Sequence, residues 1–316
     1  MLVLKEELEE VLEIVFEDGT TPAGFAKLKK VGNWSAQKFQ VFEKFLTDAD
    51  EGSGKYLSAS LLMKFFRNEV SEAVKRITGT SSDELASLRV LSSKENSPAV
   101  TISIFDGKRP RILVDLVLSI KIKGWPRTGE VALWGQSGTT SSWPDQVTVE
   151  KCRKEFHLVA KFPVLMEPSE LLWRLSLSST EKILMSPKKG GIQKECLKIG
   201  KLILCGERVL NKAIKSYYLK TILMKMMAEE ANPDDHWLKE NLGPRVIDLL
   251  KNINEAIRLK KLSHFFIPNL NLFQDLDDKQ ISSVKLIIDN VISDLQKDPK
   301  KYCEKILHAE FTNDNF

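Results

Sequence analysis

The middle of the chain carries apolar runs typical of β-strands. Residues 98–105 have the sequence PAVTISIF and residues 111–120 have RILVDLVLSI, and both are rich in β-branched side chains. Asp106-Gly107 between them is a hairpin signal, which predicts two antiparallel strands, the second of them buried. FHLVAKF (156–162) and LLWRLSLS (171–178) predict two further strands.

Helical spacing dominates the rest of the pattern. Between Tyr56 and Ile77, apolar residues recur every three or four positions behind Ser58, which is a suitable N-cap. After residue 191 the pattern predicts helices at 192–205, 211–229, 243–260 and 277–297. Residues 125–145, rich in Gly, Ser, Thr and Trp, predict a long irregular connection. A mixed sheet with helices, followed by an all-helical region, predicts an α+β fold with two domains.

Composition narrows the class of protein. The 316 residues are 42% hydrophobic, which is enough for a large core. No apolar run approaches the about 18 residues of a membrane-spanning helix, and Lys5 follows the first four residues at once, so neither a membrane span nor a signal peptide is expected. The four cysteines form no CxxC pair and are expected to be free thiols in the cytoplasm or the nucleus.

The positive charge is concentrated in one part of the chain. The net charge is +4, but residues 181–220 alone hold ten Lys or Arg against three Glu, which is 10 − 3 = +7. Such a segment can bind a polyanion, and it can equally be the solvated face of lysine-rich helices. Charge alone leaves both interpretations open.

Asp115 lies in the middle of an apolar strand sequence. An unpaired carboxylate inside a buried strand is costly, so Asp115 must either reach an open face or have a cation beside it. A divalent metal that activates a hydroxyl for phosphoryl or nucleotidyl transfer would suit this position. A carboxylate that accepts backbone hydrogen bonds at a sheet edge is the alternative.

Three further groups of residues suit the binding of phosphate. Strand alternation places Arg174, Ser176 and Ser178 on one side, where a guanidinium and two hydroxyls could hold a polyphosphate; an exposed sheet face is the alternative. Lys194, Lys198 and Lys201 form one stripe of an amphipathic helix and could lie along a phosphate backbone. In Ser216-Tyr217, the hydroxyl could bond a phosphate and the ring could stack on a base, although Tyr217 could also be a core residue.

Several stretches, taken in order, resemble the male-abnormal-21 family of nucleotidyltransferase-like proteins, and in particular its cyclic GMP-AMP synthase-like branch. The resemblance covers residues from about 50 to 275 and implies a nucleotidyltransferase core at 1–188 and a helix-hairpin-helix-like region at 189–316. The matching stretches are YLSAS, SPAVTISI, ILVDLVLSIKIKGWP, WRLSLSSTEKILM, KECLKIGKLI, SYYLKT and HFFIPNLNLF.

The resemblance also implies an activity, its cofactors and its partners. It implies ATP and GTP as substrates, Mg²⁺ or Mn²⁺ as the metal, and a cyclic dinucleotide made in innate immunity when double-stranded nucleic acid binds. By position it implies a metal-binding catalytic carboxylate at Asp115; nucleotide contacts at Arg174, Ser176, Ser178, Glu181, Lys201, Ser216 and Tyr217; and nucleic-acid contacts at Lys182, Lys194 and Lys198.

Two departures from the family pattern qualify these expectations. The family has a Gly-Ser turn and then a strand with two metal-binding carboxylates, both upstream of the third metal-binding Asp, whose position matches Asp115. In this sequence Gly52-Ser53 is followed by no such strand, and Met1–Leu4 resembles the end of the strand with the two carboxylates. A two-metal site needs several carboxylates, so we expect the 316-residue form to make no product. SPKKGGIQKEC stands where the family's vertebrate DNA sensor has a His and three Cys for zinc, so no structural zinc is expected.

These departures leave several alternatives open. Double-stranded RNA and double-stranded DNA would both suit the lysine stripe, and a homodimer that forms on the ligand is compatible with either. A noncatalytic developmental protein of the same fold, which binds a nucleotide or a protein partner, is the rival interpretation. WPDQVTVEKCRKEFHLVAK, residues 143–161, fits that branch about as well.

Overall fold

The protein is described by a computed structural model, in which the chain forms two compact units. The first unit comprises Met1–Thr128 and Lys154–Ser178, and the second comprises Gly129–Arg153 and Ser179–Phe316. The structure describes residues 2–4, 8–16, 19, 21–32, 34, 37–48, 54–79, 88–91, 99–106, 109–128, 131, 143–161, 170–186, 191–230, 236–274 and 276–312.

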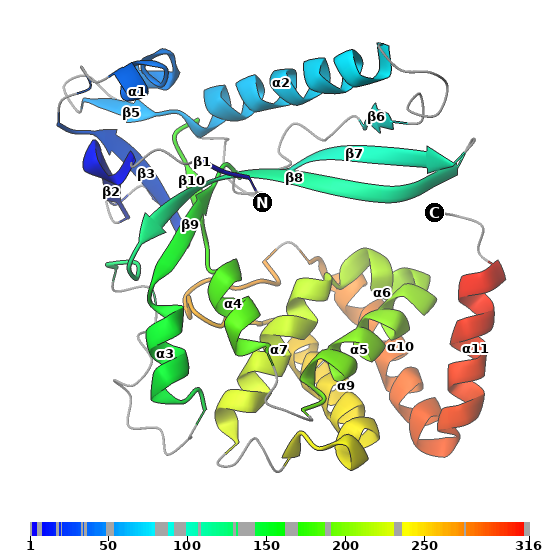
Figure 1. Ribbon diagram of the computed structural model, residues 1–316. Coiled ribbons are helices and arrows are strands. Elements are labelled where there is room, and N and C mark those ends of the chain that lie inside the picture. The colour runs from blue at the N-terminus through cyan, green and yellow to red at the C-terminus, as the bar shows by residue number, and fades with distance from the viewer. Residues whose placement is uncertain are drawn as a thin grey trace. The chain divides into compact units, whose positions relative to one another are not determined.

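The first unit is built on a ten-stranded sheet (Figure 1). The strand order is β4-β5-β3-β10-β9-β8-β7-β6, with β2 antiparallel to β3 and β1 parallel to β8. The strands are β1 Leu2–Leu4, β2 Leu12–Val15, β3 Phe25–Lys30, β4 Leu46–Asp48, β5 Lys55–Leu57, β6 Leu88–Val90, β7 Ala99–Asp106, β8 Arg109–Lys123, β9 Glu155–Val159 and β10 Trp173–Ser176.

The predicted central hairpin is confirmed. Strands β7 and β8 pair antiparallel from Ala99↔Val117 to Asp106↔Arg109. The expectation that the second strand is buried is wrong for its first half, because Leu113 is 61% exposed and its neighbours Ile112 and Val114 are exposed as well. The physical reason is the length of β8: its register with β9 begins only at Ser119, so the tip of the hairpin extends past the neighbouring strand.

Helix α2, Ala59–Gly79, belongs to the first unit and contacts β6. It begins later than Tyr56, which lies in β5 instead and pairs with Thr47 of β4. The predicted N-cap is confirmed, because Ser58 Oγ accepts a hydrogen bond from the backbone N–H of Leu61 at 3.2 Å. The unit also contains the short helix α1, Gln37–Gln40.

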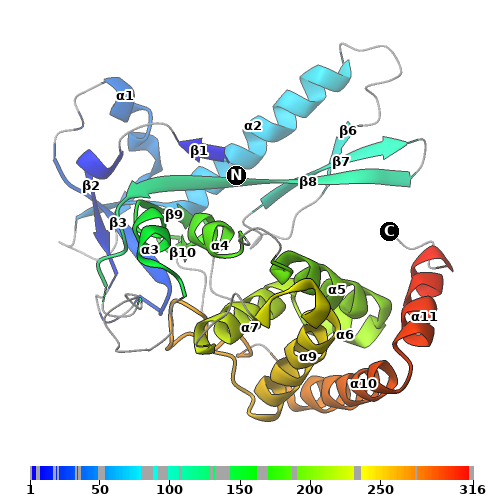
Figure 2. The same ribbon diagram turned by 60° about the horizontal axis from the view of Figure 1, so that its bottom comes forward.

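The second unit is helical, as the sequence predicts. Its centre is α9, which contacts α5, α7 and α10 (Figure 2). Its helices are α3 Gln146–Cys152, α5 Gln193–Gly206, α6 Arg208–Ala213, α7 Ser216–Glu229, α9 Leu242–Arg258, α10 Asp278–Lys297 and α11 Pro299–Thr312, and α4 Ser178–Leu184 begins at the limit between the units.

The helix limits differ from the predicted ones in two places. The single helix expected at 211–229 is divided into α6 and α7 by Ile214 and Lys215, and α11 was not predicted. Of the connection predicted at 125–145, residues 129–130 and 132–142 lie outside the described residues. Among the helices that the structure describes, none combines the length and the apolar character needed to span a membrane.

The apolar side chains of α9 form one buried stripe. Val246, Leu249, Leu250, Ile253 and Ile257 recur at spacings of one, three and four residues, and all five are buried. Burying an aliphatic side chain of this size contributes about 1.5–3 kcal/mol. This stripe therefore explains why a helix with so many charged residues on its other side holds the centre of the unit.

Candidate functional site

Asp115 lies near the middle of β8, next to the exposed residues Ile112, Leu113 and Val114. Its side chain is exposed, and its Oδ1 accepts a hydrogen bond of 2.7 Å from Thr101 Oγ1, directly opposite on β7. An exposed carboxylate loses little hydration, so its presence in this apolar sequence needs no neighbouring cation. Of the two alternatives that the sequence left for Asp115, the structure shows the first, an open face, and the role of Asp115 as a metal ligand stays a prediction.

The strand register places Asp115 on the same face of the sheet as two predicted nucleotide contacts. Arg174 pairs with Val159, and Val159 pairs with Ser119, so these three side chains share a face. Because side chains alternate along a strand, Asp115 lies on that face too, four residues before Ser119. At about 3.3 Å per residue and about 4.8 Å per strand, Asp115 is about 13 Å along the sheet and about 10 Å across it from Arg174.

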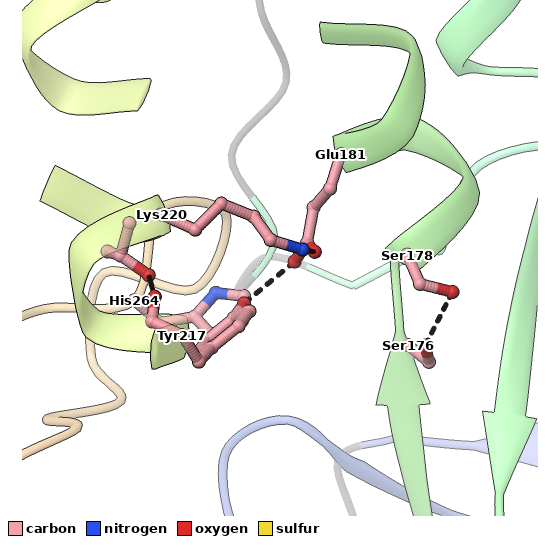
Figure 3. A network of polar contacts seen from close by, with 7 residues as sticks. Ser176, Ser178, Glu181, Tyr217, Lys220 and His264 are labelled. Carbon is pink, nitrogen blue, oxygen red and sulfur yellow. Dashed lines mark hydrogen bonds and ion pairs between the residues drawn. The ribbon is translucent and has the colours of Figure 1, made fainter. Parts of the chain in front are cut away.

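Ser176 and Ser178 lie close together, but not on one strand. Strand β10 ends at Ser176 and α4 begins at Ser178, so the predicted alternation from Arg174 through Ser178 is wrong at its last position. The chain turns into the helix there, and Ser176 Oγ donates to Ser178 Oγ at 3.3 Å (Figure 3). Arg174 and Ser176 are half-buried and share one face of β10.

The described residues do not by themselves form a metal site. Among them, no three or more His, Cys, Asp or Glu side chains come together in a way that could hold an ion. A two-metal centre for phosphoryl chemistry needs several carboxylates, and Asp115 contributes one. These residues therefore do not fit such a centre.

The densest polar network of the predicted site residues lies in the helical unit. Glu181 on α4 is buried, its side chain being only 5% exposed. Tyr217 Oη donates to Glu181 Oε1 at 2.8 Å, and Lys220 Nζ donates to Oε2 at 2.6 Å. Tyr217 Oη also forms a hydrogen bond of 2.7 Å with Nε2 of His264 (Figure 3). Residues of α4, α7 and the segment after α9 thus meet at one tyrosine hydroxyl.

Sequence reasoning found two members of this network and missed two. Glu181 and Tyr217 were predicted as nucleotide contacts. Lys220 follows Tyr217 by three residues on α7, and this helical spacing was a usable signal for a neighbour on the same face. His264, 47 positions beyond Tyr217, had no local signal in the sequence.

The predicted lysine stripe is confirmed as an exposed helix face. Lys194, Lys198 and Lys201 lie on α5 and are exposed, whereas Cys196 and Ile203 of the same helix are buried. Lys182 on α4 is exposed as well. None of the ion pairs recorded among the described residues involves these four lysines, so their charges face solvent.

Comparison with protein families now identifies the chain. Residues 1–187 match the Mab-21 protein nucleotidyltransferase domain, and residues 192–290 match the Mab-21 protein HhH/H2TH-like domain. The chain belongs to the Mab-21 family. The predicted family and the predicted α+β fold with a helical C-terminal region are therefore confirmed. The predicted limit between residues 188 and 189 stays a prediction.

Among characterised relatives of this Mab-21 chain are two proteins named cyclic GMP-AMP synthase. The Mus musculus protein is 32% identical over 250 residues, and the Sus scrofa protein is 29% identical over 246 residues; these cover 72% and 71% of the chain and 46% of each relative. A cyclic GMP-AMP synthase-like receptor from Magallana gigas is 30% identical over 201 residues, which is 59% of the chain and 32% of that protein. The matched regions thus span less than half the length of these relatives.

The predicted site residues of this Mab-21 chain fall into three groups. Asp115, Arg174 and Ser176 share a face of the sheet in the first unit, and Ser178 follows Ser176 at the start of α4. Glu181 and Tyr217 join Lys220 and His264 in a half-buried network of the second unit, while Ser216 is exposed at the first position of α7. The third group is the set of exposed lysines, Lys182, Lys194, Lys198 and Lys201.

Proposed function

We propose that this Mab-21 family chain is a nucleotidyltransferase of the cyclic GMP-AMP synthase-like group. In this proposal the reaction of the group takes ATP and GTP, makes a cyclic dinucleotide when double-stranded nucleic acid binds, and serves innate immune signalling in the cytoplasm or the nucleus. Residues 1–316 by themselves bind nucleotide without making the product, because the described residues bring together no cluster of the carboxylates that the reaction needs. The observation that carries the proposal is the common sheet face of Asp115, Arg174 and Ser176. The names of the relatives support the same choice.

The polar groups suit the binding of a nucleoside triphosphate. The Arg174 guanidinium can donate two parallel hydrogen bonds to phosphate oxygens, and the neighbouring hydroxyls of Ser176 and Ser178 can donate further ones. Mg²⁺ or Mn²⁺ would neutralise charge on the phosphates, and we propose Asp115 as one ligand of that ion. Lys201 and Ser216 are proposed as additional phosphate contacts, and Tyr217 as the ring that stacks on a base.

The exposed lysines suit a nucleic-acid backbone. Lys194 and Lys198 are one helical turn apart on α5, and Lys182 lies on α4. Each phosphate that a lysine neutralises releases counterions, which makes binding weaker as salt rises. Backbone contacts of this kind serve duplex RNA and duplex DNA alike, and a homodimer formed on the duplex would double the number of contacts.

The salt dependence of duplex binding tests the proposal. We expect log K to fall linearly with log[salt] in a filter-binding assay, and the Lys194→Ala, Lys198→Ala double variant to reduce the slope by about 2, because two phosphate contacts contribute about 0.9 each. The matched control is Lys279→Ala, Lys297→Ala, which removes the same charge from exposed positions of α10. Equal slopes for the wild type and the α5 variant would contradict the assignment.

A noncatalytic Mab-21 protein is the second candidate. The observation that favours it is the lack of a carboxylate cluster among the described residues, because nucleotide binding without a metal clamp yields no product. The filter-binding assay with duplex RNA and duplex DNA also distinguishes the noncatalytic protein from the nucleic-acid-activated enzyme. If nucleotides bind while neither duplex RNA nor duplex DNA does, the noncatalytic alternative is favoured.

A further inference from the structure

The ring of His264 has a defined hydrogen-bond polarity. Its Nδ1 is the shared acceptor for two backbone N–H groups, those of Phe266 at 3.1 Å and Ile267 at 3.2 Å. An imidazole nitrogen that accepts hydrogen bonds carries no hydrogen, so a neutral His264 must carry its hydrogen on Nε2. If both nitrogens were protonated, the hydrogen on Nδ1 would point at the backbone N–H groups of Phe266 and Ile267, which are themselves donors. The two backbone groups therefore select a single tautomer.

This polarity extends through Tyr217 to Glu181. The Nε2–H of His264 must donate to Tyr217 Oη, which is 2.7 Å away. The hydroxyl then directs its own hydrogen to Glu181 Oε1 at 2.8 Å, while Lys220 occupies Oε2. A hydroxyl can donate once and accept from another donor at the same time, so all of these contacts are compatible. The hydrogen bonds therefore run in one direction, from His264 to Glu181.

The segment that carries His264 is itself held in place. The backbone N–H of His264 donates to Leu270 O at 2.8 Å, and Ser263 forms a β-bridge with Asn271. Asn271 Oδ1 accepts hydrogen bonds from the backbone N–H groups of Leu262 and Phe273. The imidazole is therefore presented to Tyr217 from a braced turn, with the ring centroids 5.7 Å apart and the rings tilted by 37°.

We propose that His264 is a positioning residue that fixes the Tyr217 ring and, through its hydroxyl, the Glu181 carboxylate. The proposal rests on the proposed function, in which Tyr217 stacks on a nucleotide base. Glu181 has both carboxylate oxygens occupied and its side chain is 5% exposed, so it acts on the nucleotide by orienting Tyr217 and not by contact. His264 thus determines which ring orientation meets the base.

Two substitutions separate positioning from a merely structural role. His264→Asn keeps an oxygen in the place of Nδ1, which can still accept from the two backbone N–H groups, but it has no donor that reaches the hydroxyl of Tyr217. Tyr217→Phe keeps the aromatic ring and removes the hydroxyl. We expect each to weaken the binding of Mn²⁺-ATP or Mn²⁺-GTP, measured by calorimetry, by about five- to tenfold, the equivalent of one hydrogen bond. The double variant should bind nucleotide no more weakly than either single variant, because all three variants lose the same hydrogen bond between His264 and Tyr217. The control is His236→Asn, at an exposed histidine.

A spectroscopic measurement tests the network without any nucleotide. The ¹⁵N shifts of the His264 ring should show a hydrogen on Nε2 and none on Nδ1, in the wild type and in Tyr217→Phe. A hydrogen on Nδ1 would overturn the proposal. If the wild type binds nucleotide and His264→Asn binds it equally well, the positioning role alone is refuted. If the wild type binds neither nucleotide, the proposed function fails, and the positioning role with it, whatever tautomer the spectrum shows.

Discussion

At the scale of single residues, exposure decides what a side chain can do. Asp115 is acceptable in an apolar strand because it faces solvent and has Thr101 opposite. Glu181 is the opposite case, since a buried carboxylate needs compensating donors, and Tyr217 and Lys220 supply them. A carboxylate is therefore an accessible group in one unit and a fixed internal group in the other.

The four cysteines should divide by burial in a thiol-labelling experiment. Burial raises the pKa of Cys152 to about 11 and that of Cys196 to about 12, whereas Cys205 and Cys303 are exposed. The thiolate is the reactive form, and at pH 8 the two buried thiols stay protonated because pH 8 lies below both values. We expect iodoacetamide to modify Cys205 and Cys303 in the native protein, and all four after unfolding, as read by peptide mass spectrometry. Rapid native labelling of Cys196 would contradict this arrangement.

At the scale of elements, helix α5 has two faces with separate tasks. The lysine face is exposed, and the opposite face packs into the helical unit through Cys196, Gly200 and Ile203. A Cβ placed at Gly200 would lie 3.1 Å from Leu249 Cδ2 and 3.2 Å from Leu219 Cδ1. The absence of a side chain at this position therefore allows α5 to approach α7 and α9 closely.

Filling the position of Gly200 should destabilise the protein. Gly200→Val puts a branched side chain where a single Cβ is already tight, and overpacking of this kind costs about 1–3 kcal/mol. The matched control is Cys205→Val, which adds the same β-branched residue at an exposed position of α5. We expect a lower free energy of unfolding in urea for Gly200→Val and little change for the control. Equal stabilities of the two variants would show that the helices can separate without cost.

At the scale of the whole molecule, the predicted site residues are divided between two folding units. The sheet unit contributes a face with Asp115, Arg174 and Ser176, and the helical unit contributes the Tyr217 network and the lysines. Of the predicted site residues on that face, Asp115 is the one carboxylate, and no carboxylate cluster forms among the described residues. This shortage leads to a prediction about the polypeptide as a whole.

The polypeptide of residues 1–316 should bind nucleotide but make no cyclic dinucleotide. Its described residues bring no carboxylate cluster together, and the reaction needs several carboxylates to hold two ions. The measurement is chromatography of products after incubation with ATP, GTP, Mn²⁺ and duplex RNA or DNA. Formation of a cyclic dinucleotide by this polypeptide would refute the prediction, provided that Asp115→Asn removes the product.

The sequence by itself determined the family and those features that depend on neighbours along the chain. The hairpin of β7 and β8, the Ser58 cap and the two faces of α5 were all predictable because strand alternation, turn residues and helical spacing act within a few positions. The fold class followed from the order of these elements. The shortening of β10 at Ser176 was missed because Ser178 suits a strand and a helix start equally well.

Tertiary structure decided which of these residues are buried and which meet. The tip of β8 is exposed because β9 pairs only with its second half, and no pattern within RILVDLVLSI expresses the length of another strand. His264 reaches Tyr217 across 47 positions because packing brings the turn after α9 to the start of α7. Local preferences arise from the backbone and its immediate neighbours, whereas burial and the partners of a polar group depend on which distant segments pack around it.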